Sequence, residues 1–409
     1  MKTNKKTIII GIFSVILLVG ACAWFYIIKS FYDFALSANN WHNMQPKNPN
    51  IPIALQEKNA DKSIEELEKI RQQEIDIYKK RKRDDIQAHE FFKNKQKDIY
   101  ITSFDNLKLH GIMALYPTRA EEEDVKSRDI EPFLLPLKKY EGLEAPKAAD
   151  SNVNGPEMYN NEEAPKAADN DNQEDSINLN GQLFSHKWAI IIHGYRDNAN
   201  AYFIEGKKFY ELGYNVLFVD LRGHGRSEGD FITMGWYERL DIKDWIKQII
   251  DWDHDAQIVL YGVSMGAATV MMTLGEELPS NVKAGIEDCG YSSAYSIFLC
   301  NLHSMFGISN IPARLILNSL MLYVRIKDGY WLTDVSSVEQ LQKNKRPILF
   351  IHGDSDTYVP TEMIDDVFEA SNTDKKKVII ENSPHAMNDY VDNTLYWSSI
   401  ENFLTEHIK

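Results

Sequence analysis

The chain has 409 residues, a formal net charge of −15 at pH 7 and 44% hydrophobic residues. Its length allows one large domain with accessory segments, and its acidity argues against nucleic acid as a partner, since nucleic acid is bound through basic surfaces. The three cysteines show no spacing typical of a zinc site, so neither a metal nor another cofactor is expected. Cys289 and Cys300 either form a disulfide outside the cell or lie buried as free thiols.

The N-terminus contains an uncharged run of 22 residues, Thr7 to Ile28. As an α-helix this run spans about 33 Å, enough to cross the hydrocarbon core of a bilayer. Lys2, Lys5 and Lys6 precede it, and by the positive-inside rule they keep that end in the cytoplasm. We therefore expect residues 1–30 to be a single-pass signal anchor in the cell membrane, with the rest of the chain extracytoplasmic.

Processing of this segment is the competing interpretation. Ala21, Cys22 and Ala23 resemble a cleavage site for a signal peptide, and residues 19–22 resemble a lipid-attachment motif. Retention is favoured because five apolar residues, Trp24 to Ile28, continue past that point. The aromatic residues among them are typical of a membrane interface.

Residues 31–97 are expected to form a juxtamembrane helical stalk. Ser63 to Arg83 predicts a charged helix, with Ser63 as its N-cap and Glu66 in capping-box position. Its apolar residues recur at helical spacing and form one face. That face either packs on the folded domain or leaves the helix as a solvated stalk.

A domain spanning residues 98–409 follows, with a large interruption. Two strands, Asp98 to Ser103 and Leu107 to Leu115, form its antiparallel beginning. From Arg119 to Gln182, sixteen acidic residues outnumber seven basic ones. Such a segment buries too little apolar surface to offset its ordering entropy, so residues 118–186 are expected to be a disordered acidic insertion.

Beyond the insertion, apolar strand patterns alternate with helical patterns, which predicts an α/β fold with a mostly parallel, doubly wound sheet. The expected strands are Trp188–Ile192, Asn215–Val219, Ile258–Tyr261, Ala284–Glu287, Ile348–Ile351 and Val378–Ile380, and the expected helices are Asn198–Leu212, Trp236–Asp251, Ala267–Leu278, Glu362–Ala370 and Asn388–His407. Residues 290–345 are mostly apolar with helical spacing. They are expected to form a lid that excludes water and presents an apolar wall to a substrate.

Residues 262–266 read Gly-Val-Ser-Met-Gly and lie between a strand and a helix. This GxSxG pattern is typical of a nucleophile elbow, whose sharp turn leaves no room for a Cβ at the flanking glycines. Ser264 is therefore the candidate nucleophile. An ordinary strand-to-helix turn is the alternative reading of so short a motif. Upstream, a buried strand ends at His193 and Gly194, so the N–H groups of Tyr195 and Met265 are the candidate oxyanion donors.

Two later loops supply the remaining candidates. The strand that ends at Ile351 runs into a loop with Asp354 and Asp356, and the last strand is followed by His385. A carboxylate after a strand orients a histidine, and a histidine activates a serine. The carboxyl ends of parallel strands meet at one edge of a sheet, so these groups are expected to converge there with Ser264.

With Ser, acid and His in that order, the chain resembles the α/β hydrolases, over roughly Ile99 to Lys409. The family's HGxxDxxVP pattern matches residues 352–360 and implies Asp356 rather than Asp354 as the acid, and its DxRGxGxS loop matches residues 220–227. The resemblance points most closely to membrane-anchored bacterial hydrolases of the serine aminopeptidase-like branch. It implies an eight-stranded, mostly parallel sheet and a mechanism, but hardly a substrate. Two nearby histidines are expected to shape loops rather than act as the base: His193 and His224.

The expected activity is that of a membrane-anchored serine hydrolase with a Ser264–His385–Asp356 triad. A carboxylesterase on small acyl or apolar esters is favoured, because the lid offers no close cluster of carboxylates to hold the free amine of a peptide. Serine peptidase, thioesterase and acyltransferase remain open, since they would use the same residues. A non-catalytic surface scaffold is the alternative from another class.

Overall fold

The computed structural model describes residues 5–38, 64–117 and 184–408 of the chain. Side chains are described from Gly20 onward in the first helix and, in the second, at Asp76, Ile77 and from Lys79 onward. The predicted disordered insertion, 118–186, lies almost wholly outside the described residues. The chain divides into two units, residues 1–116 with 185–409 and residues 117–184, and only the first carries the elements discussed below.

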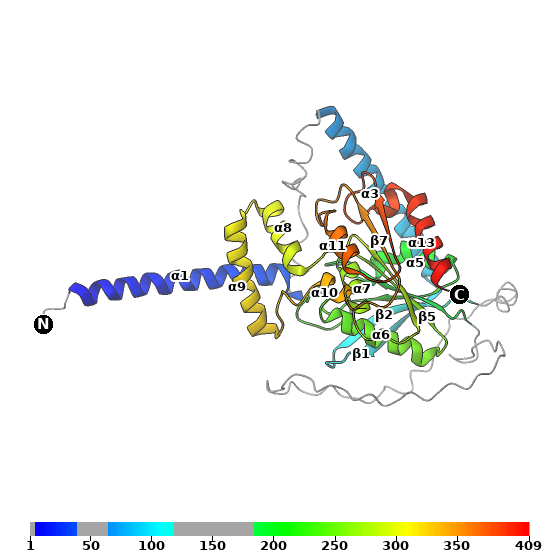
Figure 1. Cartoon of the computed structure of the whole chain (residues 1–409), viewed down its shortest axis with the longest axis horizontal. Coiled ribbons are helices and arrows are strands. Elements are labelled where there is room, and N and C mark those ends of the chain that lie inside the picture. The colour runs from blue at the N-terminus through cyan, green and yellow to red at the C-terminus, as the bar shows by residue number, and fades with distance from the viewer. Residues whose placement is uncertain (1–4, 39–63, 118–183, 409) are drawn as a thin grey trace. The chain divides into compact units, whose positions relative to one another are not determined.

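An eight-stranded sheet in the order β1-β2-β4-β3-β5-β6-β7-β8 forms the centre of the larger unit (Figure 1). β1 and β2 pair antiparallel, β2 pairs antiparallel with β4, and all other pairs are parallel. The prediction of a mostly parallel sheet with an antiparallel start is thus confirmed. The strands are β1 Gln96–Thr102, β2 Lys108–Ala114, β3 Lys187–Ile192, β4 Asn215–Val219, β5 Gln257–Val263, β6 Val282–Asp288, β7 Ile348–Gly353 and β8 Lys375–Ile380.

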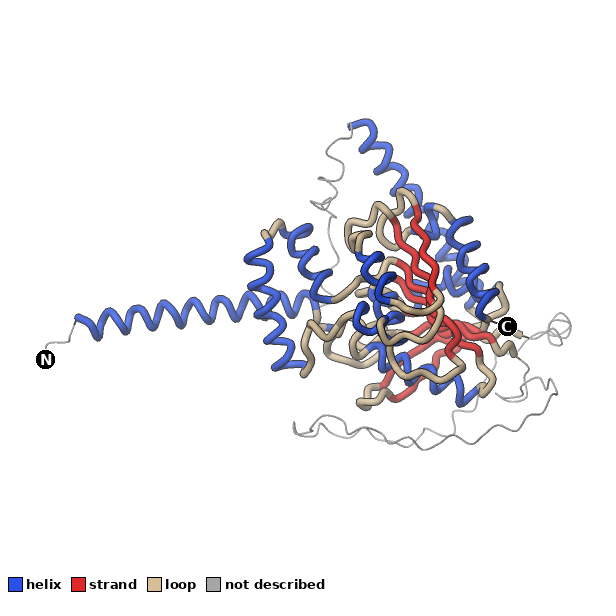
Figure 2. Tube along the Cα trace, in the orientation of Figure 1, coloured by secondary structure: helices blue, strands red, loops and turns tan. Residues whose placement is uncertain are grey.

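Helices cover both faces of this sheet (Figure 2). They are α1 Lys5–Ala35, α3 Ile64–Phe92, the 3₁₀ turn η2 Ala199–Tyr202, α5 Phe203–Glu211, α6 Glu238–Trp252, α7 Met265–Leu274, α8 Ala294–Phe306, α9 Asn310–Asp328, α10 Ser337–Leu341, α11 Met363–Ala370, α12 Asn388–Val391 and α13 Asn393–His407. One buried cluster joins α3, α5 and α13 to alternate strand residues such as Ala284 and Ile286. Gly285 between them points the other way, where a Cβ would meet Val270 of α7. The period-2 alternation of β6 therefore separates two helical layers.

The two N-terminal helices differ from their predicted limits. α1 continues to Ala35, so the expected boundary at residue 30 falls inside a helix. α3 extends to Phe92 and is no free stalk, because Ala88 and Phe92 are buried in the same cluster as Phe203 of α5. The apolar face of α3 thus packs on the body of the folded domain.

Smaller differences have local causes. The predicted helix Asn198–Leu212 begins as a 3₁₀ turn capped by the Asn198 side chain, which accepts from the N–H of Asn200. The predicted helix Asn388–His407 is broken at Asp392, whose backbone is not helical and whose side chain caps α13 by accepting the N–H of Leu395. The predicted lid, 290–345, contains α8, α9 and α10, as expected from its apolar helical spacing.

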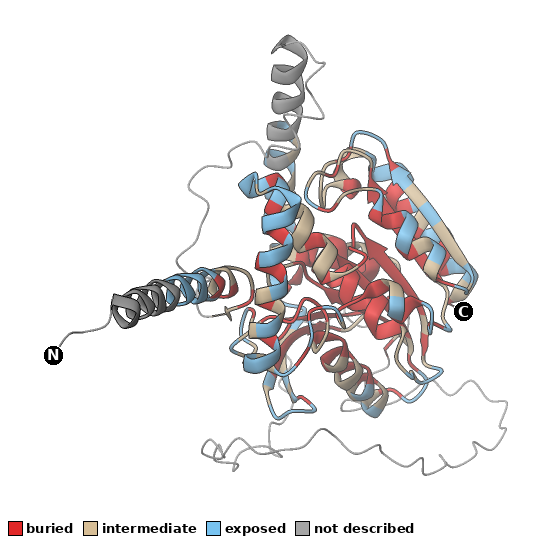
Figure 3. Cartoon of the chain, turned by 60° about the vertical axis from the view of Figure 1, so that its left-hand side comes forward, coloured by how far each residue is buried: buried red, intermediate tan, exposed pale blue. Residues whose placement is uncertain are grey.

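The predicted anchor, Thr7 to Ile28, lies within α1, and its side chains up to Val19 are outside the described residues. In the ranges that the structure describes, no helix has an apolar stretch long enough to cross a membrane. Figure 3 shows α1 changing from exposed to buried toward its C-terminal end, where Tyr32 and Leu36 have no exposed surface. That end is part of the folded domain.

Candidate active site

Ser264 sits on a strained turn between β5 and α7. Its φ of 58° lies in the left-handed region, which costs a non-glycine residue about 1–3 kcal/mol. The turn is tight on both sides, since a Cβ on Gly262 would lie 2.3 Å from the carbonyl oxygen of Gly266, and one on Gly266 would lie 2.1 Å from that of Ile192. The N–H of Ser264 donates to the carbonyl of Asp288 at 2.8 Å, which fixes the turn to β6. Steric crowding therefore explains why both flanking residues are glycines, as the GxSxG motif indicated.

The structure brings Ser264, His385 and Asp356 together at the carboxyl ends of β5, β7 and β8. The Ser264 Oγ lies 2.9 Å from Nε2 of His385, and Nδ1 of His385 lies 2.6 Å from Oδ2 of Asp356. With the carboxylate ionised, Nδ1 carries the proton and donates a hydrogen bond to Asp356, which leaves Nε2 to accept a hydrogen bond from the serine hydroxyl. This is the arrangement in which a histidine can remove a serine proton.

Asp356 is buried and fully engaged. Its Oδ1 accepts the N–H groups of Tyr358 and Val359, both at 2.8 Å, and its Oδ2 faces His385 and, at 3.3 Å, Nε2 of His352. Burial alone would raise the pKa of Asp356, but the nearby His385 and the hydrogen bonds from both histidines outweigh it and hold that pKa well below its usual range. The neighbouring Asp354 instead accepts the N–H of Asn382 at 2.7 Å. Asp356 is thus the charged partner of the imidazole.

The predicted oxyanion loop passes directly beside the nucleophile. A Cβ on Gly194 would lie 3.5 Å from the Cβ of Ser264, so the backbone leading into Tyr195 runs along the serine. Met265 is the first residue of α7, where backbone N–H groups have no partner within the helix. The structure therefore places both candidate donors, Tyr195 and Met265, at the same rim as the triad.

The other histidines of this region support loops, in line with their predicted role. His193 Nε2 accepts the N–H of Leu221 at 3.0 Å, and His224 Nε2 accepts the N–H of Arg196 at 3.2 Å. Burial lowers the pKa of His193 to about 3, with the neighbouring His224 adding to the effect. Neutral imidazoles thus fasten the oxyanion loop to the loop after β4.

Arg81 of α3 was not among the predicted site residues. Its Nη1 donates to the carbonyl of Ala386 at 2.7 Å, directly after His385, and its Nη2 contacts Glu205 at 3.3 Å. Ala386 has a φ of 55°, so the histidine loop is held in a strained form that this hydrogen bond stabilises. In the sequence Arg81 is one of five consecutive basic residues, 79–83, and nothing in that run distinguishes it.

A second unpredicted contact ties the histidine loop to the sheet. Asp288 accepts the side-chain N–H of Asn388 at 2.6 Å and the hydroxyl of Tyr396 at 2.8 Å. Burial raises the pKa of Asp288, and those two hydrogen bonds act against the rise. The residue that receives the Ser264 N–H through its backbone thus also holds the start of α12 through its side chain.

The end of α1 contacts the oxyanion loop from the lid side. The Tyr195 hydroxyl donates to the carbonyl of Ala35 at 2.8 Å, and the Arg196 guanidinium donates to the carbonyl of Phe34. The Cζ atom of that guanidinium also lies over the ring of Phe34, 4.9 Å from the ring centroid. Sequence reasoning missed this contact because it assigned residues 31–38 to a separate stalk.

Potential metal ligands and cavities add little to this picture. In the described part of the chain, one group of potential ligand atoms lies close together, from Cys289, Asp356 and His385. Two of these belong to the triad, and burial raises the pKa of the Cys289 thiol well above its ordinary value, which keeps it protonated. Cys289 and Cys300 are both free thiols, so the disulfide alternative is not realised.

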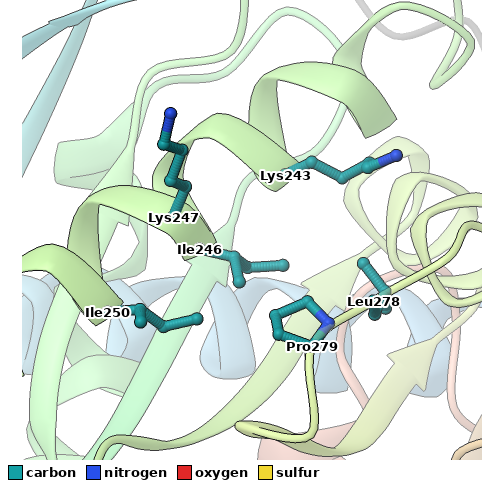
Figure 4. Close-up of a pocket in the computed structure, with 6 residues that line it drawn as sticks. All are labelled: Lys243, Ile246, Lys247, Ile250, Leu278 and Pro279. Carbon is teal, nitrogen blue, oxygen red and sulfur yellow. The ribbon is translucent and has the colours of Figure 1, made fainter. Parts of the chain in front are cut away.

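A hollow of about 280 Å³ lies away from the triad (Figure 4). Residues of α6 and of the turn after α7 line it: Lys243, Ile246, Lys247, Ile250, Leu278 and Pro279. No triad residue is among them, so its position gives it no part in the chemistry at Ser264.

Comparisons with known proteins agree with this fold. Residues 185–287, from β3 into β6, match a family model described as serine aminopeptidase S33. The uncharacterised protein YqkD of Bacillus subtilis is 28% identical over 216 residues, which cover 53% of this chain and 70% of that protein. The uncharacterised protein YfhR of Escherichia coli O157:H7 is 23% identical over 201 residues, which cover 48% of this chain and 62% of that protein.

Among solved structures, the Pyrococcus furiosus esterase Pf2001 superposes with a TM-score of 0.50 at 20% identity, covering 78% of this chain and 96% of that one. At that identity the likeness concerns the fold. The strand order and the nucleophile elbow agree with this likeness, so the chain has the α/β-hydrolase fold, and its residues 185–287 match the serine aminopeptidase S33 family model.

Proposed function

We propose that this α/β hydrolase is a serine carboxylesterase that works through an acyl-enzyme. The observation that carries the proposal is the hydrogen-bonded series from Ser264 through His385 to Asp356. His385 removes the serine proton as Ser264 attacks the carbonyl carbon of the ester. The N–H groups of Tyr195 and Met265 stabilise the oxyanion that forms, and the imidazolium then protonates the departing alcohol. Water, activated by the same imidazole, releases the acid and restores the serine.

An ester is favoured over a peptide with a free amino terminus because of the lid. The lid lies wholly within the described residues, and its three acidic side chains are Asp328, Asp334 and Glu339. Asp328 accepts from the Tyr32 hydroxyl, Asp334 accepts the N–H of Trp331, and Glu339 lies in α10. These positions do not cluster, whereas recognition of an ammonium group calls for convergent carboxylates.

A fluorophosphonate probe and a short p-nitrophenyl ester test the chemistry. We expect the full-length protein to be labelled and to hydrolyse the ester, and Ser264→Ala to lose labelling and about 10³-fold or more in kcat. The matched control is Ser398→Ala on the exposed side of α13, which should change neither. Labelling that survives Ser264→Ala refutes the assignment. Faster turnover of aminoacyl p-nitroanilides than of any acyl ester would favour a peptidase, the family model's namesake activity.

We further propose that α1 holds the enzyme at the outer face of the cell membrane. The uncharged run Thr7 to Ile28 and the lysines before it support this placement. In the structure Trp24 to Ile27 are also exposed, just before α1 becomes buried against the lid. The intact mass of the native protein measures whether the segment is retained. A mass that corresponds to a chain beginning at Cys22 or Trp24 would contradict an uncleaved anchor.

A further inference from the structure

The lid helix α9 has an apolar stripe that no part of the described chain covers. Ile311, Leu315, Leu322 and Ile326 recur at intervals of four and seven residues, so they lie on one side of the helix. Each exposes more than half of its surface, up to 78% at Ile326. A surface helix of a soluble protein normally turns its polar side outward, and α9 instead has apolar residues on both its buried and its exposed sides.

The contacts between α1 and α9 show which way this stripe faces. The indole N–H of Trp24 donates to Ser319 at 3.1 Å, while Tyr32, eight residues nearer the body, packs on Tyr323 and donates to Asp328. Ser319 is one turn from both Leu315 and Leu322, at the edge of the stripe. The stripe therefore faces toward the N-terminal part of α1 and away from the sheet.

α9 crosses α1 instead of running alongside it (Figure 1). A helix that crosses another at a steep angle lies flat on any surface that the other helix enters end-on. Trp24, Phe25, Tyr26 and Ile27 of α1 are exposed at the same level as the stripe. Aromatic residues at such a level are typical of the boundary between lipid headgroups and hydrocarbon.

Charge at the stripe also favours a lipid surface. Arg314 and Arg325 are exposed beside it, Lys327 follows, and the one acidic residue of α9, Asp328, is hydrogen-bonded to Tyr32. α9 thus has three basic residues and one acidic residue in a chain with a net charge of −15. Exposed apolar residues flanked by basic ones are the pattern of helices that lie in the headgroup region of anionic bilayers.

We infer that α9 is an in-plane membrane helix whose stripe of Ile311, Leu315, Leu322 and Ile326 rests in the headgroup region of an anionic bilayer. This inference rests on the proposed membrane attachment through α1 and not on the proposed esterase activity. It makes the lid the face of the enzyme that touches lipid, so that esters dissolved in the bilayer reach the site from beneath the lid.

Site-specific fluorescence in reconstituted protein tests the inference. The full-length chain, with Cys22→Ser and Cys300→Ser, carries an environment-sensitive probe at Leu322→Cys and is placed in vesicles of phosphatidylcholine and phosphatidylglycerol. Lipids with a spin label near the headgroup serve as quenchers. The matched control is the same probe at Ile86→Cys, an exposed apolar position on α3, the helix that packs on α5. We expect several-fold stronger quenching at position 322 than at position 86.

A third probe separates the two proposals. A chain with Cys300→Ser alone carries the probe at the native Cys22, which is exposed on α1. Quenching at Cys22 with equally weak quenching at 322 and 86 overturns the inference and leaves the α1 attachment standing, whereas no quenching at any position overturns both. An unquenched but blue-shifted probe at 322 that responds to dilution in lipid shows a second copy on the stripe, and that also overturns the inference.

Discussion

At the rim of the sheet the functional groups are held by short polar contacts, whereas α8 of the lid is held on α1 by aromatic packing. Asp356 has backbone N–H groups on one oxygen and imidazoles on the other. In the lid, by contrast, Phe306 meets Phe31 and Phe34 edge to face at 6.0 Å. A hydrogen bond loses most of its energy when its distance or angle changes a little, whereas the energy of apolar packing is spread over many weak contacts and decreases gradually. Rim variants should therefore lower the rate for every substrate, and lid variants should change which substrates are turned over.

The largest effect is expected at the acid. Asp356→Asn replaces the charged partner of His385 with a neutral amide and disfavours the productive tautomer, so kcat for a soluble acetyl ester should fall by about 10³- to 10⁴-fold. Asp354→Asn is the matched control, two residues away, and keeps an acceptor for Asn382. Steady-state kinetics of both variants decide between them. A larger loss of kcat in Asp354→Asn than in Asp356→Asn would identify Asp354 as the acid that orients His385.

The next effect concerns the histidine loop. Arg81→Ala removes the hydrogen bond to Ala386, and a displaced catalytic group costs about 10- to 100-fold, seen in kcat and not in KM. Partial recovery in Arg81→Lys would indicate positioning through the donor. Lys79→Ala, on the exposed side of the same helix, is the control. Thermal unfolding must accompany the kinetics, because Glu205 loses its ion pair. Full activity in a folded Arg81→Ala protein would show that the loop of His385 keeps its conformation without the hydrogen bond from Arg81.

A smaller, substrate-dependent effect is expected in the lid. Phe306→Ala removes two aromatic contacts with α1, worth about 1 kcal/mol each, and loosens the contact between the lid and α1. We expect KM for long-chain esters to rise several-fold, with acetyl ester hydrolysis nearly unchanged. Met305→Ala, at the adjacent exposed position, is the control. An equal loss on both esters would place Phe306 with the rim instead.

The smallest effect on activity is expected at Glu287, where a substitution should instead change how the free energy of unfolding depends on pH. Burial raises the pKa of Glu287 to about 8, above its ordinary value of 4.5. Between these two pKa values the folded chain therefore binds more protons than the unfolded chain. The contribution of Glu287 to stability falls as the pH rises from the lower value to the higher one. Glu287→Gln keeps an acceptor for Gly290 and removes the titration. The variant should gain stability relative to the parent between about pH 5 and pH 8 in urea unfolding. Parallel curves would contradict the raised pKa.

The parts that the sequence predicted well are those where local chemistry leaves one solution. The flanking glycines of Ser264 and the strand alternation around it are short-range features, and they predicted the elbow and the sheet. Asp356 and His385 follow strands whose carboxyl ends must share one edge, so their meeting was predictable from topology.

The rest depends on packing between distant segments. Arg81 lies 305 positions from its acceptor Ala386, and a run of five basic residues gives no sign of which one is buried. The end of α1 was assigned to a stalk because an apolar run next to a charged stretch predicts a membrane boundary, not a contact with the loop of Tyr195 and Arg196. Such tertiary contacts leave no periodic signal in a single sequence.

The short ladder between residues 36–38 and 230–232 has a practical consequence. Leu36 accepts the N–H of Ile232, and Ala38 donates to Asp230, so this stretch behaves as an added edge of the domain. A shortened form that starts at residue 39, as one would prepare to obtain a water-soluble enzyme, would lose this edge together with the carbonyls that receive Tyr195 and Arg196. Its specificity would then be that of an opened site, and assays on trimmed protein would report on a different enzyme from the one in the cell.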